Sequence, residues 1–204
     1  LGARFVLVPN HLEVDLRLPR YTPVYGNDLV RVYRNEDALP RMRLVAAARH
    51  VTAEEARQAL ASGTIAGAPV DGRRVALVEV PTDLDRAAPP AAAESRLRTL
   101  SSEGGIVEVA SDSATAGLLV HGTNFAPGWE VSLDGSPRPL LRVDGLVQGV
   151  VVPAGAHVVR FRYRPASFAV GAALSLTGLA LALLVAGGFP GRMFPGALWP
   201  QRMR

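Results

Sequence analysis

The stretch NFAPGWEVSLDGSPRPLLRVDG, residues 124–145, contains a Pro-Gly turn and two Asp-Gly dipeptides. Asp-Gly favours the two-residue hairpin turn of type I′, because both central residues of that turn need a positive φ angle. Between these turns apolar and polar side chains alternate, which is typical of a strand with one buried face. The stretch therefore predicts consecutive antiparallel hairpins.

Further strands are expected on both sides of this stretch. In the second half of the chain the predicted strands are 105–111, 117–122, 128–133, 138–143, 146–152 and 156–164. In the first half they are 4–8, 29–35, 41–48 and 73–80. Short strands at a spacing of about ten residues, joined by tight turns, predict a mainly β fold, an antiparallel β-sandwich of jelly-roll-like type.

One short soluble helix is predicted within VTAEEARQALASG, residues 51–63. Thr52 is the expected N-cap, Glu55 completes a capping box, and Gly63 ends the helix. A Pro- and Ala-rich segment near 81–97 is expected to be an exposed loop or linker. Composition leaves open whether 1–80 and 98–164 form one domain or two.

A second helix, at 165–190, is expected to cross a membrane. No charged side chain occurs from Ala166 to Gly191. The densest apolar part, 168–189, would rise about 33 Å as a helix, enough for a hydrocarbon core of about 30 Å. The small residues on one face of this helix are Gly171, Ser175, Gly178, Ala182 and Ala186. Either this face packs against other transmembrane helices, or an Ala- and Gly-rich composition produces it by chance.

The short tail predicts how the chain is oriented in the membrane. Residues 191–204 carry Arg192, Arg202 and Arg204, and short basic flanks favour the cytoplasmic side. The β-rich domain, residues 1–164, would then be extracytoplasmic, on the outside of a bacterial cell membrane. The chain starts at Leu1 without a signal peptide, so we expect it to be part of a longer protein.

The charged residues argue against nucleic acid as a partner. All 22 basic residues are arginine, and the net charge of +4 is spread along the chain without a basic run. Aromatic residues make up only 6% and form no stacking series. The chain has no cysteine, which excludes disulfides and cysteine-ligated metals within it.

Trp129 is the first candidate binding residue. It begins a predicted strand on which it shares a face with Val131 and Leu133. It is therefore either a core residue or a platform on which a sugar ring stacks.

The last predicted strand supplies the other candidates, which are Arg160, Arg162 and Arg164. They alternate with apolar residues, so the three guanidinium groups are expected on one face. This face is either solvated, keeping an edge strand from aggregating, or it binds the phosphates of lipid headgroups or of a lipid pyrophosphate.

The sequence contains no recognisable catalytic or metal-binding motif. It has no phosphate-cradling Gly loop, nucleophile elbow or zinc-binding His pair. The four histidines, predicted to be surface or hydrogen-bonded structural residues, are His11, His50, His121 and His157. Asp112 and Asp134 would form an acid–base pair only if the fold brought them together. No catalytic residue, metal or cofactor is therefore assigned to this chain.

Three segments resemble the bacterial YfhO-like membrane proteins. The first is VYRNEDALPRMRLV, residues 32–45, and the second is 117–176. The second contains, in order, a Leu-Val strand, Pro-Gly-Trp, Asp-Gly, Val-Pro-Ala-Gly-x-His and Phe-x-Tyr-x-Pro, followed by the apolar span. LGARFVLV, residues 1–8, is similar to the strand that follows the helical bundle of that family.

The resemblance implies a polytopic membrane protein similar to GT-C-type glycosyltransferases, which modify cell-surface glycopolymers. It implies a polyprenyl-phosphate sugar as donor and other transmembrane helices of the parent protein as partners. The catalytic acid of such enzymes lies in an early extracytoplasmic loop that this chain does not contain. The expected function is that of the C-terminal extracytoplasmic domain and last span of such a transferase. The alternative is a membrane-anchored β-sandwich that binds carbohydrate or acts as a scaffold, without catalysis.

Overall fold

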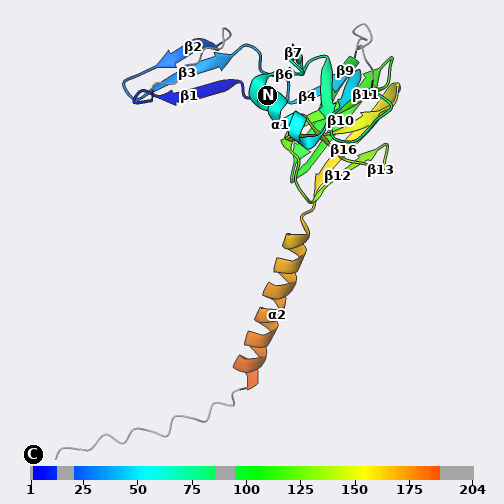
Figure 1. Ribbon diagram of the computed structural model, residues 1–204. Helices are drawn as coiled ribbons and strands as arrows, with labels where there is room; N and C mark the ends of the chain where they lie inside the picture. The colour runs from blue at the N-terminus through cyan, green and yellow to red at the C-terminus, as the bar shows by residue number, and fades with distance from the viewer. Residues whose placement is uncertain (1, 13–20, 86–94, 189–204) are drawn as a thin grey trace, which may run out of the picture. The chain divides into compact units, whose positions relative to one another are not determined.

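The computed structural model describes residues 2–12, 21–85 and 95–188, and it is mainly β (Figure 1). The chain divides into two compact units, residues 1–163 and 164–204. The first unit contains all the described strands and one short helix, and the second contains one long helix. The mainly β, antiparallel fold with two helices is thus confirmed.

One layer of the first unit is a five-stranded antiparallel sheet. Its strand order is β13 (Ser136–Arg138), β12 (Trp129–Leu133), β16 (Gly155–Tyr163), β10 (Ile106–Ser113) and β9 (Ser95–Glu103). The hairpin between β12 and β13 turns at Asp134 and Gly135, whose φ angles are 49° and 80°. These positive angles confirm the two-residue turn that Asp-Gly predicts.

The other layer is a six-stranded sheet. Its strand order is β4 (Met42–Val45), β11 (Gly117–Asn124), β15 (Val147–Val152), β14 (Leu141–Val143), β8 (Val75–Val78) and β5 (Ala47–His50). The pair β5–β8 is parallel, because helix α1 (Ala53–Ser62) carries the chain back before β8 begins. β4 and β5 are the two outer strands of this sheet, yet only one residue, Ala46, separates them in the chain. The sheet is therefore curled, and its two edges lie close together at Ala46.

Two of the three clusters of the core lie on opposite faces of β11 and β15. Leu118 and Val120 point into the curled six-stranded sheet, where they meet Val45 and Val78. Leu119, which alternates with them, points toward the five-stranded sheet. There it joins the cluster Val107, Val109, Val131, Leu133, Val150, Val152, Val159 and Phe161. This double burial explains why β11 reads as an apolar run instead of an alternating strand.

Helix α1 begins and ends as its sequence predicts. The Thr52 side chain accepts from the backbone N–H of Glu55, and the Glu55 carboxylate accepts from the Thr52 N–H at 2.7 Å. Gly63 ends the helix in the left-handed conformation with φ 72°. Ala56 and Ala59 are buried against a third cluster, and the short hairpin β6 (Thr64–Ile65) and β7 (Ala68–Pro69) follows.

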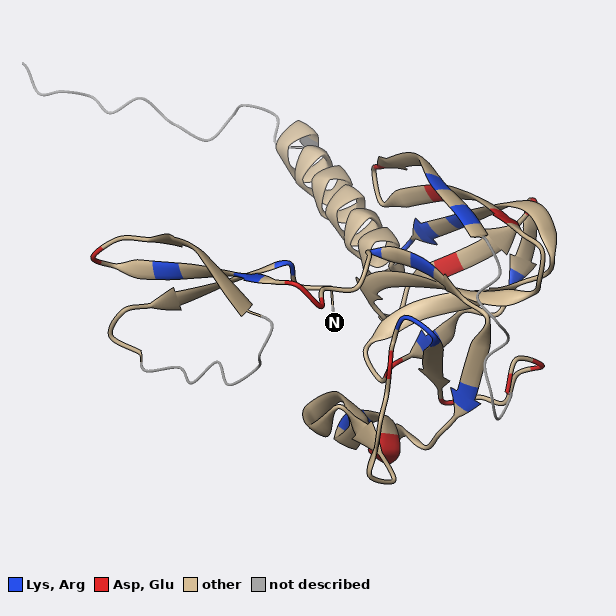
Figure 2. Cartoon of the chain, turned by 90° about the horizontal axis from the view of Figure 1, so that it is seen from above, with Lys and Arg blue, Asp and Glu red and all other residues tan. Residues whose placement is uncertain are grey.

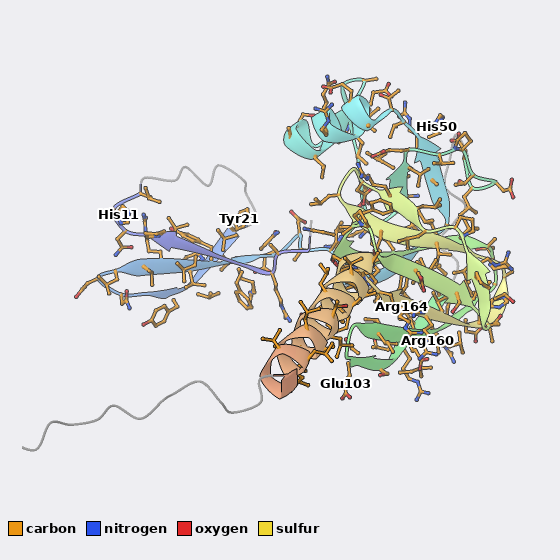
Figure 3. The ribbon with its side chains drawn as sticks, turned by 90° about the horizontal axis from the view of Figure 1, so that it is seen from below. His11, Tyr21, His50, Glu103, Arg160 and Arg164 are labelled. Carbon is orange, nitrogen blue, oxygen red and sulfur yellow. The ribbon has the colours of Figure 1, made fainter. Side chains whose placement is uncertain are left out.

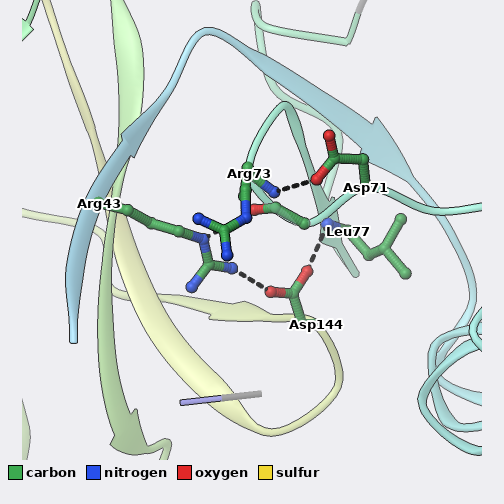
Figure 4. Close-up of polar contacts among 6 residues, drawn as sticks. Arg43, Asp71, Arg73, Leu77 and Asp144 are labelled. Atoms are coloured by element: carbon green, nitrogen blue, oxygen red, sulfur yellow. Dashed lines mark hydrogen bonds and ion pairs between the residues drawn. The ribbon is translucent and has the colours of Figure 1, made fainter. Parts of the chain in front are cut away.

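A buried ion pair ties three parts of the six-stranded sheet together (Figure 4). Nη2 of Arg43 on β4 contacts Oδ2 of Asp144, which lies in the turn after β14. The Arg43 Nε donates to the Gly72 carbonyl at 2.9 Å, and the Leu77 N–H donates to Oδ1 of Asp144 at 2.9 Å. Both charged side chains are nearly inaccessible to water, at 8% and 11% exposure.

A separate three-stranded sheet has the order β1 (Phe5–Pro9), β3 (Val30–Asn35) and β2 (Tyr21–Gly26). Strand β2 was not expected from the sequence, because Pro23 removes a ladder donor from the middle of the segment. The structure is consistent with that rule, since β2 is an edge strand whose register shifts between Pro23 and Tyr25.

Three further expectations differ from the structure. The segment 138–143, predicted to be one strand, includes the last residue of β13 and the whole of β14, which belong to different sheets. The segment 41–48, predicted to be one strand, is divided between β4 and β5. Of the expected loop near 81–97, residues 86–94 lie outside the described residues, and Ser95 already begins strand β9. Strand β9 was missed because it is an edge strand with mostly exposed side chains, so it lacks the apolar alternation that marks a strand.

The second unit is helix α2 (Ala166–Gly188), which is long and apolar enough to cross a membrane. Its mean hydropathy is 2.3, and no charged residue occurs along it (Figure 2). None of its apolar window is buried within the protein. The predicted span at 165–190 agrees with this helix as far as Gly188, and the tail at 191–204 lies outside the described residues.

Candidate functional site

The candidate site is a solvent-open hollow on the five-stranded sheet, beside β12. We call it the β12 hollow. It has a volume of about 560 Å³ and is bordered by Trp129, Glu130, Ser132, Arg138, Arg160 and Arg162, among others. The structure therefore brings together three of the four residues that the sequence singled out. Arg164 belongs to the second compact unit and is not among the residues that border the hollow.

Strand alternation places the polar residues of the hollow on one face. β12 and β16 pair so that Glu130 lies opposite Arg162 and Ser132 lies opposite Arg160. The residues between them, Val131 and Phe161, are also opposite each other and are buried in the core. The outward direction of the two arginines, predicted from the sequence, is thus confirmed.

The guanidinium groups of the hollow differ in their partners. The Arg160 Nε lies 3.3 Å from Oε1 of Glu108 on β10, and the Arg160 side chain is 48% exposed. Arg160 is labelled in Figure 3. Within the described ranges, neither Arg138 nor Arg162 has a carboxylate at ion-pair distance. Two cations of the hollow are therefore available to an anionic ligand, while the third is partly neutralised.

Trp129 lies where the hollow meets the core. Its ring is half-buried, packs against the cluster between the sheets, and lies 5.1 Å from the Tyr163 ring and 5.8 Å from that of His121. It shares the inward face with Val131 and Leu133, as the alternation predicted. Its packing supports the core role, and its position at the border of the hollow leaves the stacking role as a prediction.

Beneath Trp129 is a buried polar pair, His121 and Gln148. The Gln148 Nε2 donates to His121 Nδ1 at 3.1 Å, so the neutral ring carries its proton on Nε2 and donates to Thr123 Oγ1 at 2.9 Å. Burial, reinforced by the nearby Arg41 guanidinium, lowers the pKa of His121 to about 4. His121 is thus a hydrogen-bonded structural histidine, as predicted, and its ring packs against that of Trp129 edge to face.

At the other end of β16, His157 and Asp134 form a surface pair. Nδ1 of His157 lies 2.7 Å from Oδ2 of Asp134, and the Val158 N–H donates to Oδ1 at 2.8 Å. The Asp134 carboxylate raises the pKa of His157. The pKa of Asp134 is lowered, first by the hydrogen bond from the Val158 N–H and then by the one with His157. At a pH between these two pKa values, His157 is protonated and Asp134 is ionised, so the two side chains attract each other. The attraction is lost above the pKa of His157, where the imidazole is neutral, and below the pKa of Asp134, where the carboxyl is neutral.

Several residues of the hollow were not predicted. Glu130 and Ser132 could have been found, because strand alternation puts them on the same face as the arginines of the paired strand. Arg138 and Leu140 could not, since their approach depends on how the short strand β13 pairs with β12.

Metal binding finds no support in the described parts of the chain, where no three His, Asp or Glu side chains lie close enough together to hold an ion. The β12 hollow offers guanidinium groups, a carboxylate, a hydroxyl and part of an indole ring. This set suits a ligand that carries both a phosphate and a hydroxylated ring.

No protein-family model matches the chain, and neither do curated proteins or solved structures.

Proposed function

We propose that this chain is a membrane-anchored module that binds a phosphate-bearing sugar in the β12 hollow. The observation that carries the proposal is the pairing of β12 with β16, which places the unpaired Arg162 beside Glu130 and near Trp129. Guanidinium groups bind phosphate with two parallel hydrogen bonds, while carboxylate and hydroxyl groups bind sugar hydroxyls.

The short connection between the sheet and α2 supports a ligand that is attached to lipid. Arg162 precedes Ala166, the first residue of α2, by four residues, so the extended chain between them spans at most about 14 Å. If α2 crosses the bilayer, Arg162 stays close to the headgroup layer. A polyprenyl-phosphate sugar would present its phosphate at that level.

In the wider setting, we propose that the parent protein is a YfhO-like glycosyltransferase that acts on cell-surface glycopolymers. The module would lie on the extracytoplasmic side and hold the donor or the acceptor near catalytic groups elsewhere in that protein. The resemblance of 117–176 to that family supports this setting. The rival is a sandwich that binds carbohydrate or only braces other transmembrane helices, without serving a transferase.

Ligand binding can be tested with the full chain in nanodiscs of zwitterionic lipid. The probe is mannose 6-phosphate, with mannose as the uncharged comparison, and the readout is isothermal titration or ligand-detected NMR. Arg162→Gln should lower the affinity about tenfold or more, because it removes a charge-assisted hydrogen bond of about 1.5–3 kcal/mol. Arg57→Gln on α1, an exposed residue outside the hollow, is the matched control and should bind as the unmodified chain does.

A lipid headgroup could supply the same phosphate chemistry, so a second arm separates the two sources. Mannose 6-phosphate binding is repeated in nanodiscs that contain anionic phosphatidylglycerol. Competition by the anionic lipid that depends on Arg162 would assign the hollow to headgroups instead of sugars. If the unmodified chain binds mannose and mannose 6-phosphate equally, or binds neither, the proposal is wrong.

The side of the membrane can be tested directly because the chain contains no cysteine. A single Gln58→Cys variant places a thiol on the exposed face of α1. In intact cells that express the parent protein with this substitution, a membrane-impermeant maleimide should label it without permeabilisation, above the background of the same protein without Gln58→Cys. Labelling that requires permeabilised cells would place the β unit in the cytosol and contradict the proposal.

A further inference from the structure

A second hollow lies on the same sheet, at the opposite end of β16. We call it the β10 hollow. It has a volume of about 580 Å³ and is bordered by Arg96, Arg98, Ala110, Asp112, Ala156 and His157, among others. None of these residues was a predicted binding residue, although the sequence did raise Asp112 and Asp134, which both border this hollow.

The register across β9, β10 and β16 explains why the surface is hollow there. Ala110 lies between Arg98 on β9 and Val158 on β16, and Asp112 lies between Arg96 and Ala156. Short side chains in the middle of the sheet thus leave space between longer ones at its rim. The middle of the hollow combines the apolar Ala110 with the Asp112 carboxylate, and Arg96 and Arg98 border it on β9. This set suits a sugar ring whose hydroxyls bond the carboxylate and whose anionic group is held by the guanidinium groups.

The cations of this hollow are also available to a ligand. Arg96 and Arg98 form no ion pair within the parts of the chain that the structure describes. His157 borders the hollow, and its Nδ1 lies 2.7 Å from Oδ2 of Asp134. The hollow thus has two unpaired guanidinium groups on β9, the Asp112 carboxylate on β10 and an imidazole–carboxylate pair beyond it.

The two hollows lie along the same outer face of β16. The outward residues of this strand are Ala156, Val158, Arg160 and Arg162, because Val159 and Phe161 between them are in the core. Val158 borders the β10 hollow and Arg160 borders the β12 hollow, and these two positions are about 7 Å apart along a strand. From Ala156 to Arg162 the same face extends for about 20 Å. The Arg160–Glu108 ion pair lies on this face next to Val158, where the β12 hollow approaches the β10 hollow.

We propose that the two hollows form one track that binds several successive units of an anionic glycan, with the β10 hollow as its second subsite. This proposal rests on the proposed function of the β12 hollow. It adds that the natural ligand is a polymer instead of a single sugar. Unpaired guanidinium groups at both ends, Arg162 at one and Arg96 with Arg98 at the other, would each hold one anionic group. The polymer would cross the sheet along β16 between them.

The test compares two probes that carry the same phosphate group. Mannose 6-phosphate represents a single unit, and a phosphomannan core polymer represents many. The full chain is used in zwitterionic nanodiscs at about 0.15 M salt, where long-range charge effects are screened beyond about 8 Å. The double variant Arg96→Gln/Arg98→Gln should lower the affinity for the polymer about tenfold or more. It should leave the affinity of the β12 hollow for mannose 6-phosphate unchanged, because that hollow keeps Arg162.

A matched control removes the same charge elsewhere. In Arg57→Gln/Arg142→Gln both residues are exposed and lie outside the two hollows. Polymer affinity should stay within about twofold in this variant, and thermal unfolding should confirm that both double variants are folded. An equal loss in the control would show that net charge, not the track, binds the polymer, and would overturn the proposal.

The outcomes separate this proposal from the proposed function. If Arg162→Gln weakens both probes while Arg96→Gln/Arg98→Gln weakens neither, the β12 hollow stands and the track is wrong. If mannose 6-phosphate does not bind at all but the polymer binds and depends on Arg96 and Arg98, the single-sugar function fails and the polymer subsite stands. If the polymer binds no more tightly than mannose 6-phosphate, the track is overturned.

Discussion

At the scale of single residues, Asp144 combines two demands that few side chains can meet. Its backbone has φ 51°, in the left-handed region, and its buried carboxylate receives both the Arg43 guanidinium and the Leu77 N–H. Asp and Asn tolerate this backbone better than other non-glycine residues. The residue that follows, Gly145, also has a positive φ. A Cβ atom added at Gly145 would lie 3.3 Å from side chains of α1.

Asp144→Ala should destabilise the β unit by about 3–5 kcal/mol, because it leaves the Arg43 charge buried without a partner. Asp144→Asn keeps the turn conformation and an acceptor for Leu77, so it should cost less. The free energy of unfolding in urea, followed by circular dichroism, measures both. Equal stability of Asp144→Ala and the unmodified chain would mean that Arg43 finds another partner or reaches water.

His121 should make the stability of the β unit depend on pH. Its pKa is lowered to about 4, whereas that of an unfolded histidine is about 6.5. Between these values the unfolded chain binds a proton that the folded protein does not, so stability falls as the pH falls from 6.5 toward 4. From pH 7 to pH 5 the loss from this one group is about 2 kcal/mol.

The measurement is the difference in the free energy of unfolding between pH 7 and pH 5. His121→Gln removes the titrating group and keeps a hydrogen-bonding partner for Gln148, so this part of the difference should disappear. A pH dependence that is the same in His121→Gln and in the unmodified chain would show that His121 is protonated without unfolding.

At this scale the sequence predicted contacts only between residues that are close together along the chain. The alternation in β16 was enough to place Arg160 and Arg162 outward, because it is a local property of one strand. The Asp134–His157 pair spans 23 residues, and the Arg43–Asp144 pair spans 101. Such pairs depend on strand register, which no local pattern determines.

At the scale of elements, helix α2 has the clearest physical requirement. Its leucines are exposed in the protein, among them Leu176 at 67% and Leu179 at 57%. In water this surface would be strongly unfavourable, whereas in lipid it is solvated by acyl chains. The apolar composition alone was therefore enough to predict this helix to within about two residues at its start.

The double variant Leu176→Arg/Leu179→Arg should impair membrane insertion, since each arginine near the helix centre costs about 2.5–3.5 kcal/mol. Alkaline carbonate extraction of membranes should release much of the variant and little of the unmodified chain. Leu176→Phe/Leu179→Phe, which keeps the apolar character, is the matched control. If the arginine variant stays fully resistant to extraction, α2 is held by something other than its own transfer into lipid.

The strands were predicted best next to the Asp-Gly turns, which close the hairpins β12–β13 and β14–β15. The Val-Pro-Ala-Gly turn closes no hairpin, because it carries the chain from β15 in one sheet to β16 in the other. The prediction failed at three edge strands, β2, β9 and β13, and it missed the short pair β6–β7. An edge strand can carry a proline or a mostly polar sequence, because one of its sides needs no ladder partner and both of its faces can be solvated. The β10 hollow lies partly on β9, so it could not be foreseen once that strand was missed.

At the scale of the whole molecule, the described core owes nothing to α2. All three clusters of buried residues consist of side chains that precede Arg164. The division into two compact units has the same boundary. We therefore expect the β unit to fold without the apolar helix.

A chain truncated after Pro165 should be water-soluble and should unfold thermally at the same midpoint as the full chain in detergent. Size-exclusion chromatography and circular dichroism measure these two properties. A truncated chain that unfolds at a much lower temperature would indicate that α2 contributes to the core. A loss of far-ultraviolet β signal would lead to the same conclusion.

The one-residue join at Ala46 has a consequence for crowding. Proteins confined to a bilayer meet their neighbours far more often than proteins in free solution, and an open sheet margin can recruit a strand from the next copy. Because one continuous segment, β4 followed by β5, serves both margins of the six-stranded sheet, neither is left as a long, flat template. Lengthening this join would loosen the seam, and we expect such insertions to show first as clustering of copies in the membrane.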